Sequence, residues 1–281
     1  MRYLIYNPLS GEENQSCIEA EGYKARANMP VKSVAITEIA DLRDFFEALE
    51  LYDDVVFFGG DGTLNKVANA LSGCLVRNDI YYYPCGTGND FARDIGIAET
   101  REPVMINDYL KDLPTITVKG QQSKFINGVG FGIDGYCCEV GDILKSCHKK
   151  PNYTAIAIKG LLFYFKPVNA TVDVDGTKYS FKKVWIAPTM FGRYYGGGMM
   201  PTPKQDRNAS DKKVSLMVLH KSGKLSTLIL FPSIFKGGHV KKEKNVSILE
   251  GRSITVTFDR PSPLQIDGET VLDVVSYSVT L

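Results

Sequence analysis

One stretch, FFGGDGTLNKVAN at residues 57–69, constrains the fold of this chain more than any other. It joins an apolar run that does not alternate to three glycines around an aspartate, and then to residues with helical spacing. An apolar run without alternation is typical of a strand whose two faces are both covered. Glycines let the backbone turn sharply and approach a ligand closely. The stretch therefore predicts a buried strand, a tight loop and a helix in direct succession.

The same order of strand and helix recurs through the first third of the chain. Strands are predicted at residues 2–7, 32–37 and 53–60, helices at 39–50 and 63–72, and a strand, a Gly-rich turn and a helix at 80–96. Strands that alternate with helices form a parallel sheet with right-handed crossovers. An α/β domain over residues 1–114 is therefore expected, with a seam near Leu113-Pro114.

The pattern changes after about residue 115, where strand-like runs separated by turns replace the alternation. Asp175-Gly176 supplies the left-handed turn residues of one predicted hairpin. A helical stretch at residues 142–165 interrupts the strands. These runs predict a β-rich sandwich or barrel over residues 115–281.

Composition excludes several classes of function. The net charge is +1, so no global field favours nucleic acid or an acidic partner. The three histidines lack metal-ligand spacing. The six cysteines form no C-x-x-C pair, which indicates free thiols in a reducing cytosol. The longest apolar stretches are too short to cross a bilayer, so we expect a cytoplasmic protein whose membrane contact is peripheral.

Three predicted strand ends carry loops that suit a phosphate. Gly59, Gly60 and Gly62 follow one strand, Gly86, Thr87 and Gly88 follow the next, and NPLSG at residues 7–11 follows the first. Ligands gather at the carboxyl ends of parallel strands, and the amides that begin a helix favour anions. Asp61 would repel a phosphate unless a cation lies between them, and Mg²⁺ is the usual cation beside nucleotide phosphates.

Two structural alternatives stay open for these acids, because Asp61 and Asp90 could each cap a helix start. The glycines clustered in three loops exceed what caps require. Two common nucleotide motifs are absent from the sequence: G-x-x-x-x-G-K-[ST], and G-x-G-x-x-G after the first strand. A P-loop enzyme is therefore excluded, and the sequence argues against an ordinary dinucleotide-binding fold.

The chain resembles the diacylglycerol kinase catalytic-domain family, which includes bacterial lipid kinases and sphingosine kinases. The matching segments are NPLSG (7–11), GGDGTLNKV (59–67), CGTGNDFAR (85–93), NGVGFGIDG (127–135), GGGMMPTP (196–203) and IDGE (266–269). The GGDGT run is shared with the NAD kinases. The resemblance implies an NAD-kinase-like α/β domain with a parallel sheet, a C-terminal β sandwich, and an active site in the cleft between the two domains.

The resemblance also implies functional residues. It predicts nucleotide contacts at Asn7, Ser10, Gly11, Thr37, Gly59, Gly60, Asp61, Gly62, Thr63, Leu64, Asn65, Lys66 and Thr87. Asp61 and Asp90 would order a catalytic Mg²⁺ through waters. Glu269 would be the general base that accepts the proton of the acceptor hydroxyl, with Asp267 beside it in the same motif. Read from the residues alone, Asp267-Gly268-Glu269 is also a common solvated hairpin turn.

Relatives hold a structural Mg²⁺ with an Asp-Gly-Leu turn, and the resemblance places that site in DRNASDKKVSLMV. Asp211 would supply a carboxylate, and Asn208 and Lys213 backbone carbonyls. This chain departs from the pattern, because Lys212 and Lys213 replace the glycine and the apolar residue.

The activity implied is an ATP- and Mg²⁺-dependent transfer of the γ-phosphate to diacylglycerol, giving phosphatidic acid. A sphingoid base or another alcohol is the alternative acceptor, and a catalytically silent nucleotide- or lipid-sensing protein is the second alternative. A lipid acceptor requires docking at a membrane surface. The basic and apolar stretches at residues 144–166 and 235–244 could provide it, or could be a core helix with solvated lysine ends. The sequence does not define an oligomeric state; a homodimer is one candidate.

Overall fold

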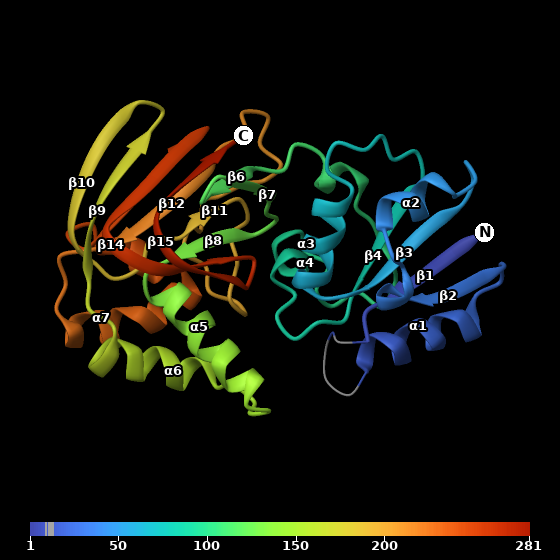
Figure 1. Cartoon of the computed structure of the whole chain (residues 1–281), viewed down its shortest axis with the longest axis horizontal. Helices are drawn as coiled ribbons and strands as arrows, with labels where there is room; N and C mark the ends of the chain where they lie inside the picture. Colours follow the sequence, from blue (N-terminus) through green and yellow to red (C-terminus); the bar gives the residue numbers. More distant parts are fainter. Residues whose placement is uncertain (9, 11–13) are drawn as a thin grey trace. The chain divides into compact units, whose positions relative to one another are not determined.

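The structure is a computed structural model that describes residues 1–8, 10 and 14–281. Its chain divides into two compact units, Met1–Leu113 and Pro114–Leu281, which we call the N-terminal and the C-terminal unit. Each unit is built on its own sheet (Figure 1). The predicted order, an α/β unit with a parallel sheet followed by a β sandwich, is confirmed.

The N-terminal unit contains a five-stranded sheet in the order β2-β1-β3-β4-β5. Its strands are β1 (Arg2–Tyr6), β2 (Val31–Ala35), β3 (Asp54–Gly59), β4 (Asp79–Pro84) and β5 (Val104–Met105). Its helices are α1 (Gln15–Arg26), η1 (Ile36–Glu38), α2 (Leu42–Glu47), α3 (Asp61–Ala70), α4 (Asp90–Asp94) and η2 (Asn107–Leu110). The first four strands run parallel, and β5 pairs antiparallel with β4.

The sequence pattern accounts for most of this unit. The β3 residues Val55–Gly59 are all buried, as a strand covered on both faces requires. Asp41 caps α2 by accepting the amides of Arg43 and Asp44. Helix α1 has no predicted counterpart, because few of its side chains are apolar and only Ser16, Ala20 and Tyr23 are buried.

The C-terminal unit is formed by a ten-stranded antiparallel sheet. Its strands are β6 (Thr115–Val118), β7 (Gln121–Lys124), β8 (Gly128–Phe131), β9 (Val168–Val174), β10 (Thr177–Val184), β11 (Thr189–Met190), β12 (Val214–Leu219), β13 (Val246–Gly251), β14 (Ser253–Ile266) and β15 (Glu269–Thr280). The first half of β14 pairs with β9 and its second half with β8, while β15 pairs along both halves. The register shifts between Thr257 and Leu264, so this strand passes from one part of the sheet to the other.

The helices of this unit differ from the prediction in two places. They are α5 (Ile133–Ser146), α6 (Tyr153–Lys159), η3 (Gly160–Tyr164), α7 (Lys224–Leu230), η4 (Phe231–Lys236) and η5 (Gly238–Lys241). The helical stretch predicted at 142–165 is two helices, because the chain breaks near Pro151. Helix α7 was not predicted, because it is short and Leu230 and Phe231 continue its apolar residues into one unbroken apolar run.

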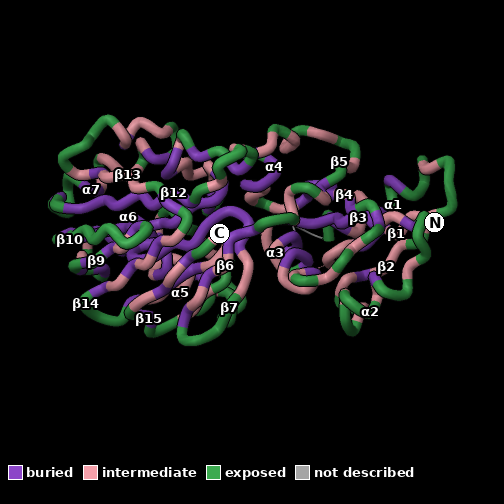
Figure 2. Tube along the Cα trace, turned by 90° about the horizontal axis from the view of Figure 1, so that it is seen from above, coloured by how far each residue is buried: buried purple, intermediate pink, exposed green. Residues whose placement is uncertain are grey.

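Buried residues run through the strands of both units (Figure 2). In the N-terminal unit, Leu4, Val56, Phe58 and Tyr83 form part of one core cluster. In the C-terminal unit, a cluster around Trp185 joins the sheet to α5, η3 and η4. Across the described part of the chain, no helix is both long enough and apolar enough to cross a bilayer.

Candidate active site

The carboxyl ends of β1, β2, β3 and β4 lie along one edge of the N-terminal sheet, because these strands are parallel. The residues that follow them there are Asn7, Ile36-Thr37, Gly60-Asp61 and Cys85-Gly86. The structure thus brings the predicted strand-end loops of this unit to a common edge. Gly11 lies outside the described residues.

Two of these loops touch backbone to backbone. A Cβ atom added to Gly86 would lie 2.4 Å from the Gly60 Cα, and one added to Gly60 would lie 2.9 Å from the Gly86 Cα. No side chain fits at either distance. These two glycines are therefore required by the close approach of the loops.

The Asp61 side chain also joins the loops after β3 and β4. Its carboxylate oxygens accept hydrogen bonds from the amides of Asp90 at 2.9 Å and Phe91 at 2.8 Å, which begin α4. The sequence raised the alternative that Asp61 caps its own helix. The structure gives Gly60 that position, so Asp61 caps the next helix in the chain instead.

Side chains after β1 complete the loop contacts. The Asn7 Nδ2 atom donates to the Thr63 hydroxyl at 2.8 Å, and the Gly60 amide donates to the Ser10 hydroxyl at 3.0 Å. The Asn89 side chain accepts the amide of Gly86 at 2.9 Å. The loops after β1, β3 and β4 are therefore held in one arrangement by contacts of their own.

The start of α3 is open to an anion. The first amides of a helix have no partner within the helix and form the positive end of its dipole. A Cβ atom on Gly62, in the first turn of α3, would meet nothing within 4 Å. A phosphate could approach this turn without meeting a side chain.

A cavity of about 620 Å³ lies beside these loops in the N-terminal unit. Three of its lining residues, Asn7, Thr37 and Lys66, were predicted to contact a nucleotide. The sequence missed the other lining residues, which are Ile36, Ile39, Ala40, Asp41, Leu42, Arg43, Asn69 and Ala70. Only their position after β2 or along α3 could have identified them.

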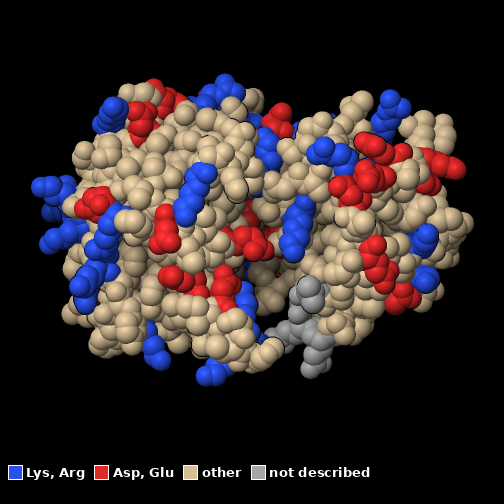
Figure 3. All heavy atoms as spheres, viewed as in Figure 1, with Lys and Arg blue, Asp and Glu red and all other residues tan. Residues whose placement is uncertain are grey.

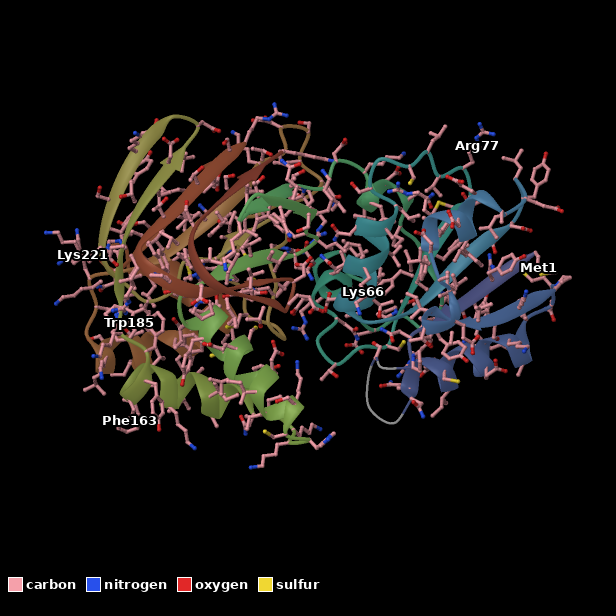
Figure 4. The ribbon with its side chains drawn as sticks, viewed as in Figure 1. Met1, Lys66, Arg77, Phe163, Trp185 and Lys221 are labelled. Atoms are coloured by element: carbon pink, nitrogen blue, oxygen red, sulfur yellow. The ribbon has the colours of Figure 1, made fainter. Side chains whose placement is uncertain are left out.

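Not all predicted nucleotide residues face this cavity. Leu64 is fully buried, so only its backbone could meet a ligand. Thr87 is exposed in the loop after β4 and does not line the cavity. Asn65 accepts the Asn69 side-chain amide at 3.1 Å, and Lys66 is exposed on α3 (Figure 4).

In the C-terminal unit, Asp267 clamps the loop before β8. Its carboxylate accepts the amides of Ile126 at 2.6 Å, Asn127 at 2.9 Å and Gly128 at 3.0 Å. Asp267 and Gly268 both have positive φ, 45° and 97°, as a two-residue hairpin turn requires. Asp267 therefore fixes the turn that precedes Glu269, and its own oxygens are occupied by amides.

Glu269 is exposed at the first position of β15, directly after this turn. Within the described residues, its carboxylate accepts no hydrogen bond. The clamp on Asp267 limits the positions that Glu269 can take, while its carboxylate stays accessible. A carboxylate held in this way can accept a proton from a bound hydroxyl.

The sequence missed a buried acid in the same unit. The Asp134 carboxylate lies at the start of α5 and accepts the Tyr195 hydroxyl at 2.5 Å, and both residues are buried. Burial raises the pKa of Asp134 to about 7, and the Tyr195 hydrogen bond opposes this shift. Asp134 lies inside the NGVGFGIDG motif, but nothing in that pattern marks it as buried.

The residues of the predicted structural metal loop make contacts with one another and with Gln205. The Lys213 ammonium lies 2.9 Å from the Asp211 carboxylate, and Gln205 donates to the Lys213 carbonyl at 2.8 Å. The Asn208 amide donates to Asp206 at 2.9 Å. Among the residues that the structure describes, no group of three His, Cys, Asp or Glu could hold a metal ion. The Lys213 ammonium thus pairs with Asp211 in this structure, and the structural Mg²⁺ at this loop stays a prediction.

Family models match both units. Residues 2–117 match the diacylglycerol kinase catalytic domain, and residues 127–278 match the YegS C-terminal NAD kinase beta sandwich-like domain. The second match covers more than half of the chain. The two matches follow one another in the same order as the two units of the structure.

Comparisons with individual proteins also find diacylglycerol kinases. The chain is 28% identical to a diacylglycerol kinase of Mycobacterium tuberculosis, over 90% of this chain and 83% of that protein. It is 26% identical to a diacylglycerol kinase of Bacillus subtilis, over 95% and 88% of the two chains. A solved diacylglycerol kinase structure from Bacillus anthracis is similar with a TM-score of 0.62 at 17% identity, over 99% and 92% of the chains; this likeness concerns the fold.

Proposed function

The chain belongs to the diacylglycerol kinase catalytic-domain family and is a lipid kinase, and from this premise we propose that it phosphorylates diacylglycerol. ATP is the phosphoryl donor, the acceptor is the free hydroxyl of diacylglycerol, and the product is phosphatidic acid. The relatives from Mycobacterium tuberculosis and Bacillus subtilis carry the name of this activity.

The observation that carries the proposal is the set of loops at the edge of the N-terminal sheet. They combine backbone glycines, the open first turn of α3 and a cavity of about 620 Å³. That volume is within the range of small-molecule and cofactor sites. We place the phosphates of ATP at the start of α3, near Gly62 and Lys66, and the nucleoside in the cavity beside Thr37.

We propose that Mg²⁺ binds together with ATP. Carboxylate oxygens are the ligands that Mg²⁺ prefers, often through water. Asp61 and Asp90 lie next to the proposed phosphate site and are joined by the Asp61 hydrogen bond to the Asp90 amide. They would hold waters of the ion, and the ion would neutralise phosphate charge during transfer.

Glu269 is the proposed general base. Phosphoryl transfer depends mainly on positioning and charge neutralisation, so the base needs only to accept the hydroxyl proton as the new bond forms. Asp267 contributes by holding the turn, because three amides occupy its oxygens. We therefore treat Asp267 as a positioning residue.

A diacylglycerol acceptor resides in a bilayer, so the proposal includes peripheral contact with a membrane surface. Such contact requires apolar and basic side chains on the outside of the protein.

The test is a kinase assay with labelled ATP and a panel of acceptors in mixed micelles. The panel contains diacylglycerol, a sphingoid base, a monoacylglycerol and no lipid, and products are separated by thin-layer chromatography. We expect Mg²⁺-dependent label in phosphatidic acid with the wild-type chain and almost none with Glu269→Gln. Glu250→Gln, an exposed glutamate of the same unit, is the matched control.

Other outcomes would identify the alternatives. Label in the sphingoid base would keep the kinase assignment and replace the acceptor. ATP binding without turnover on any acceptor would support a nucleotide- or lipid-sensing protein. Full turnover by Glu269→Gln would remove the proposed base while leaving the acceptor assignment intact.

A further inference from the structure

Large apolar side chains are exposed on two neighbouring segments of the C-terminal unit. We call them the α6–η3 segment (153–164) and the α7–η4 segment (224–236). Helix α7 packs beside η3, and the Lys224 ammonium donates to the Leu162 carbonyl at 2.7 Å. Figure 1 shows α6 and α7 next to each other along one edge of the unit. Segments some 60 residues apart in the sequence thus form one surface.

The inner side of this surface belongs to the core. Leu161 and Ile234 pack in the cluster around Trp185, and Leu228, Leu230 and Phe231 pack against that cluster. Stability of the fold therefore accounts for the inward-facing residues of both segments. It does not account for the apolar residues on the outside.

The outer side carries bulky apolar residues. Phe163 is 70%, Tyr164 66%, Leu225 68% and Ile229 72% exposed. Leu225 and Ile229 are four residues apart on α7 and so lie on one face of the helix. Phe163 points away from the body of the unit (Figure 4). With Ile158 and Phe235, also exposed, these four residues define what we call the apolar face.

The stretches of sequence that carry the apolar face have charged side chains of one sign. Residues 143–166 and 221–242 contain no aspartate or glutamate. They contain ten lysines, at positions 145, 149, 150, 159, 166, 221, 224, 236, 241 and 242. In the view of Figure 3, the edge of the unit where α6 and α7 lie has tan and blue surface. The two stretches of sequence that carry the apolar face thus contain lysines and no acidic residues, although the net charge of the chain is only +1.

We propose that the apolar face docks on an anionic lipid bilayer, with its aromatic and aliphatic side chains in the acyl boundary and its lysines among the headgroups. This location deepens the proposed function and rests on it, since the acceptor lies in the membrane. Apolar burial and lysine–headgroup attraction add together in such docking. A second copy of the chain is a poorer occupant, because a symmetric contact would bring lysines against lysines.

The first experiment measures flotation with phosphatidylcholine vesicles, with and without phosphatidylglycerol. The test variant carries Phe163→Ser, Tyr164→Ser, Leu225→Ser and Ile229→Ser. The control carries Tyr52→Ser and Leu75→Ser, which are 92% and 84% exposed in the N-terminal unit. We expect partitioning to phosphatidylglycerol vesicles to fall at least about tenfold in the test variant and to stay unchanged in the control. Equal flotation of the test variant and the wild type would overturn the proposal.

A second variant tests the role of charge. Lys159→Glu with Lys236→Glu should abolish the preference for phosphatidylglycerol and leave weak binding to both kinds of vesicle. Wild-type binding that ignores phosphatidylglycerol would overturn the anionic part of the proposal. Loss of a wild-type dimer in the four-serine variant without lipid, by light scattering, would identify the apolar face as a self-interface and also overturn it.

Turnover separates this proposal from the proposed function. On a short-chain diacylglycerol dispersed in water, the four-serine variant should match the wild type, because docking is not needed. On vesicles it should lose most of its turnover. If the wild type phosphorylates no acceptor but still floats through the apolar face, the kinase proposal fails and the docking surface stands.

Discussion

The two units hold their candidate functional loops by different means. In the N-terminal unit, the loops after β3 and β4 meet through two glycines, Gly60 and Gly86, with no side chain between them. In the C-terminal unit, carboxylate side chains hold the loops through hydrogen bonds. Asp267 accepts three amides, and Asp134 accepts the buried Tyr195 hydroxyl. The first arrangement depends on steric fit and the second on charge.

Because of this difference, the two units should tolerate different substitutions and different changes of pH. A backbone contact does not titrate, but it fails as soon as a methyl group is added. A clamp made of acids accepts changes of shape more easily, but it responds to pH and to the loss of charge. Asp61 combines the two arrangements, because it is an acid whose carboxylate joins the glycine-containing loops.

The largest expected effect tests whether Glu269 takes part in catalysis or holds a loop in place. Glu269→Gln should lower kcat by about a hundredfold to ten-thousandfold. Its melting temperature should equal that of the wild type, because the exposed Glu269 carboxylate holds no loop. Turnover in mixed micelles and thermal melting measure the two effects. A large loss of stability without loss of turnover would show that Glu269 is part of the clamp.

The pH dependence of the C-terminal unit is the next largest effect. Burial raises the pKa of Asp134 from the ordinary 3.8 to about 7, so the folded state binds a proton that the unfolded state has released. The wild type should therefore lose stability as the pH rises from about 4 to about 7, by about 4 kcal/mol relative to Asp134→Asn. Urea unfolding followed by fluorescence of Trp185, the only tryptophan, measures this difference.

Either of two other results would contradict this prediction about the pH dependence of stability. A constant difference between the wild type and Asp134→Asn over this pH range would mean that Asp134 keeps an ordinary pKa. A difference that grows in favour of the wild type would mean that the folded state stabilises the ionised carboxylate. In either case, the C-terminal unit would not be the pH-sensitive one.

Two glycine variants test the steric side of the contrast. Gly86→Ala should destabilise the N-terminal unit by about 3 kcal/mol, because its Cβ atom would overlap the Gly60 backbone. Gly62→Ala has open space and lies in a helix, so it should stabilise the unit by about 0.5 kcal/mol. It should nevertheless weaken ATP binding, which calorimetry would measure. Similar stabilities for the two variants would contradict the close approach of the loops.

A smaller effect compares two clamps of the same kind within the C-terminal unit. Asp175 also lies at positive φ in a hairpin turn and accepts the amides of Arg252 and Ser253, but it is exposed. Asp267→Asn should cost about 2 kcal/mol of unfolding free energy, and Asp175→Asn less than about 1 kcal/mol. Denaturant unfolding measures both. Equal losses would mean that burial adds nothing to the Asp267 clamp.

The smallest expected effect concerns the metal loop. Without nucleotide, chelation by EDTA should shift the melting temperature by less than about 1 °C, because an ion pair within the chain already balances the Asp211 carboxylate. Lys213 already neutralises Asp211 in the structure. A clear loss of stability on chelation, restored by Mg²⁺, would return the predicted structural metal to this loop.

The sequence predicted the parts of the site that depend on local order. A buried strand, glycines and a helix start follow one another in the chain, so the loops at Gly60 and Gly86 could be identified. The partners of their side chains could not, because they depend on contacts across the fold. Asp61 caps a helix that begins 29 residues later, and no pattern around Asp61 indicates that choice.

Packing explains what the sequence did not predict in the C-terminal unit. Helix α7 is short and mostly apolar, so its sequence does not separate an inner from an outer face, and it forms a helix where Leu228 and Leu230 pack against the Trp185 cluster. Asp134 is buried by the elements around α5, which no local pattern reveals. Lys213 replaces an apolar residue of the family pattern, but its ion pair with Asp211 is visible only in the structure.

The contact between Gly60 and Gly86 has a practical consequence. With no side chain between the loops to absorb movement, a push on one loop is transmitted directly to the other. A ligand that binds at this edge of the sheet would therefore move or fix both loops together. An engineer who wishes to change nucleotide preference should leave this pair of glycines untouched and vary the walls of the cavity, at Thr37 or Ile39, where side chains have room to change.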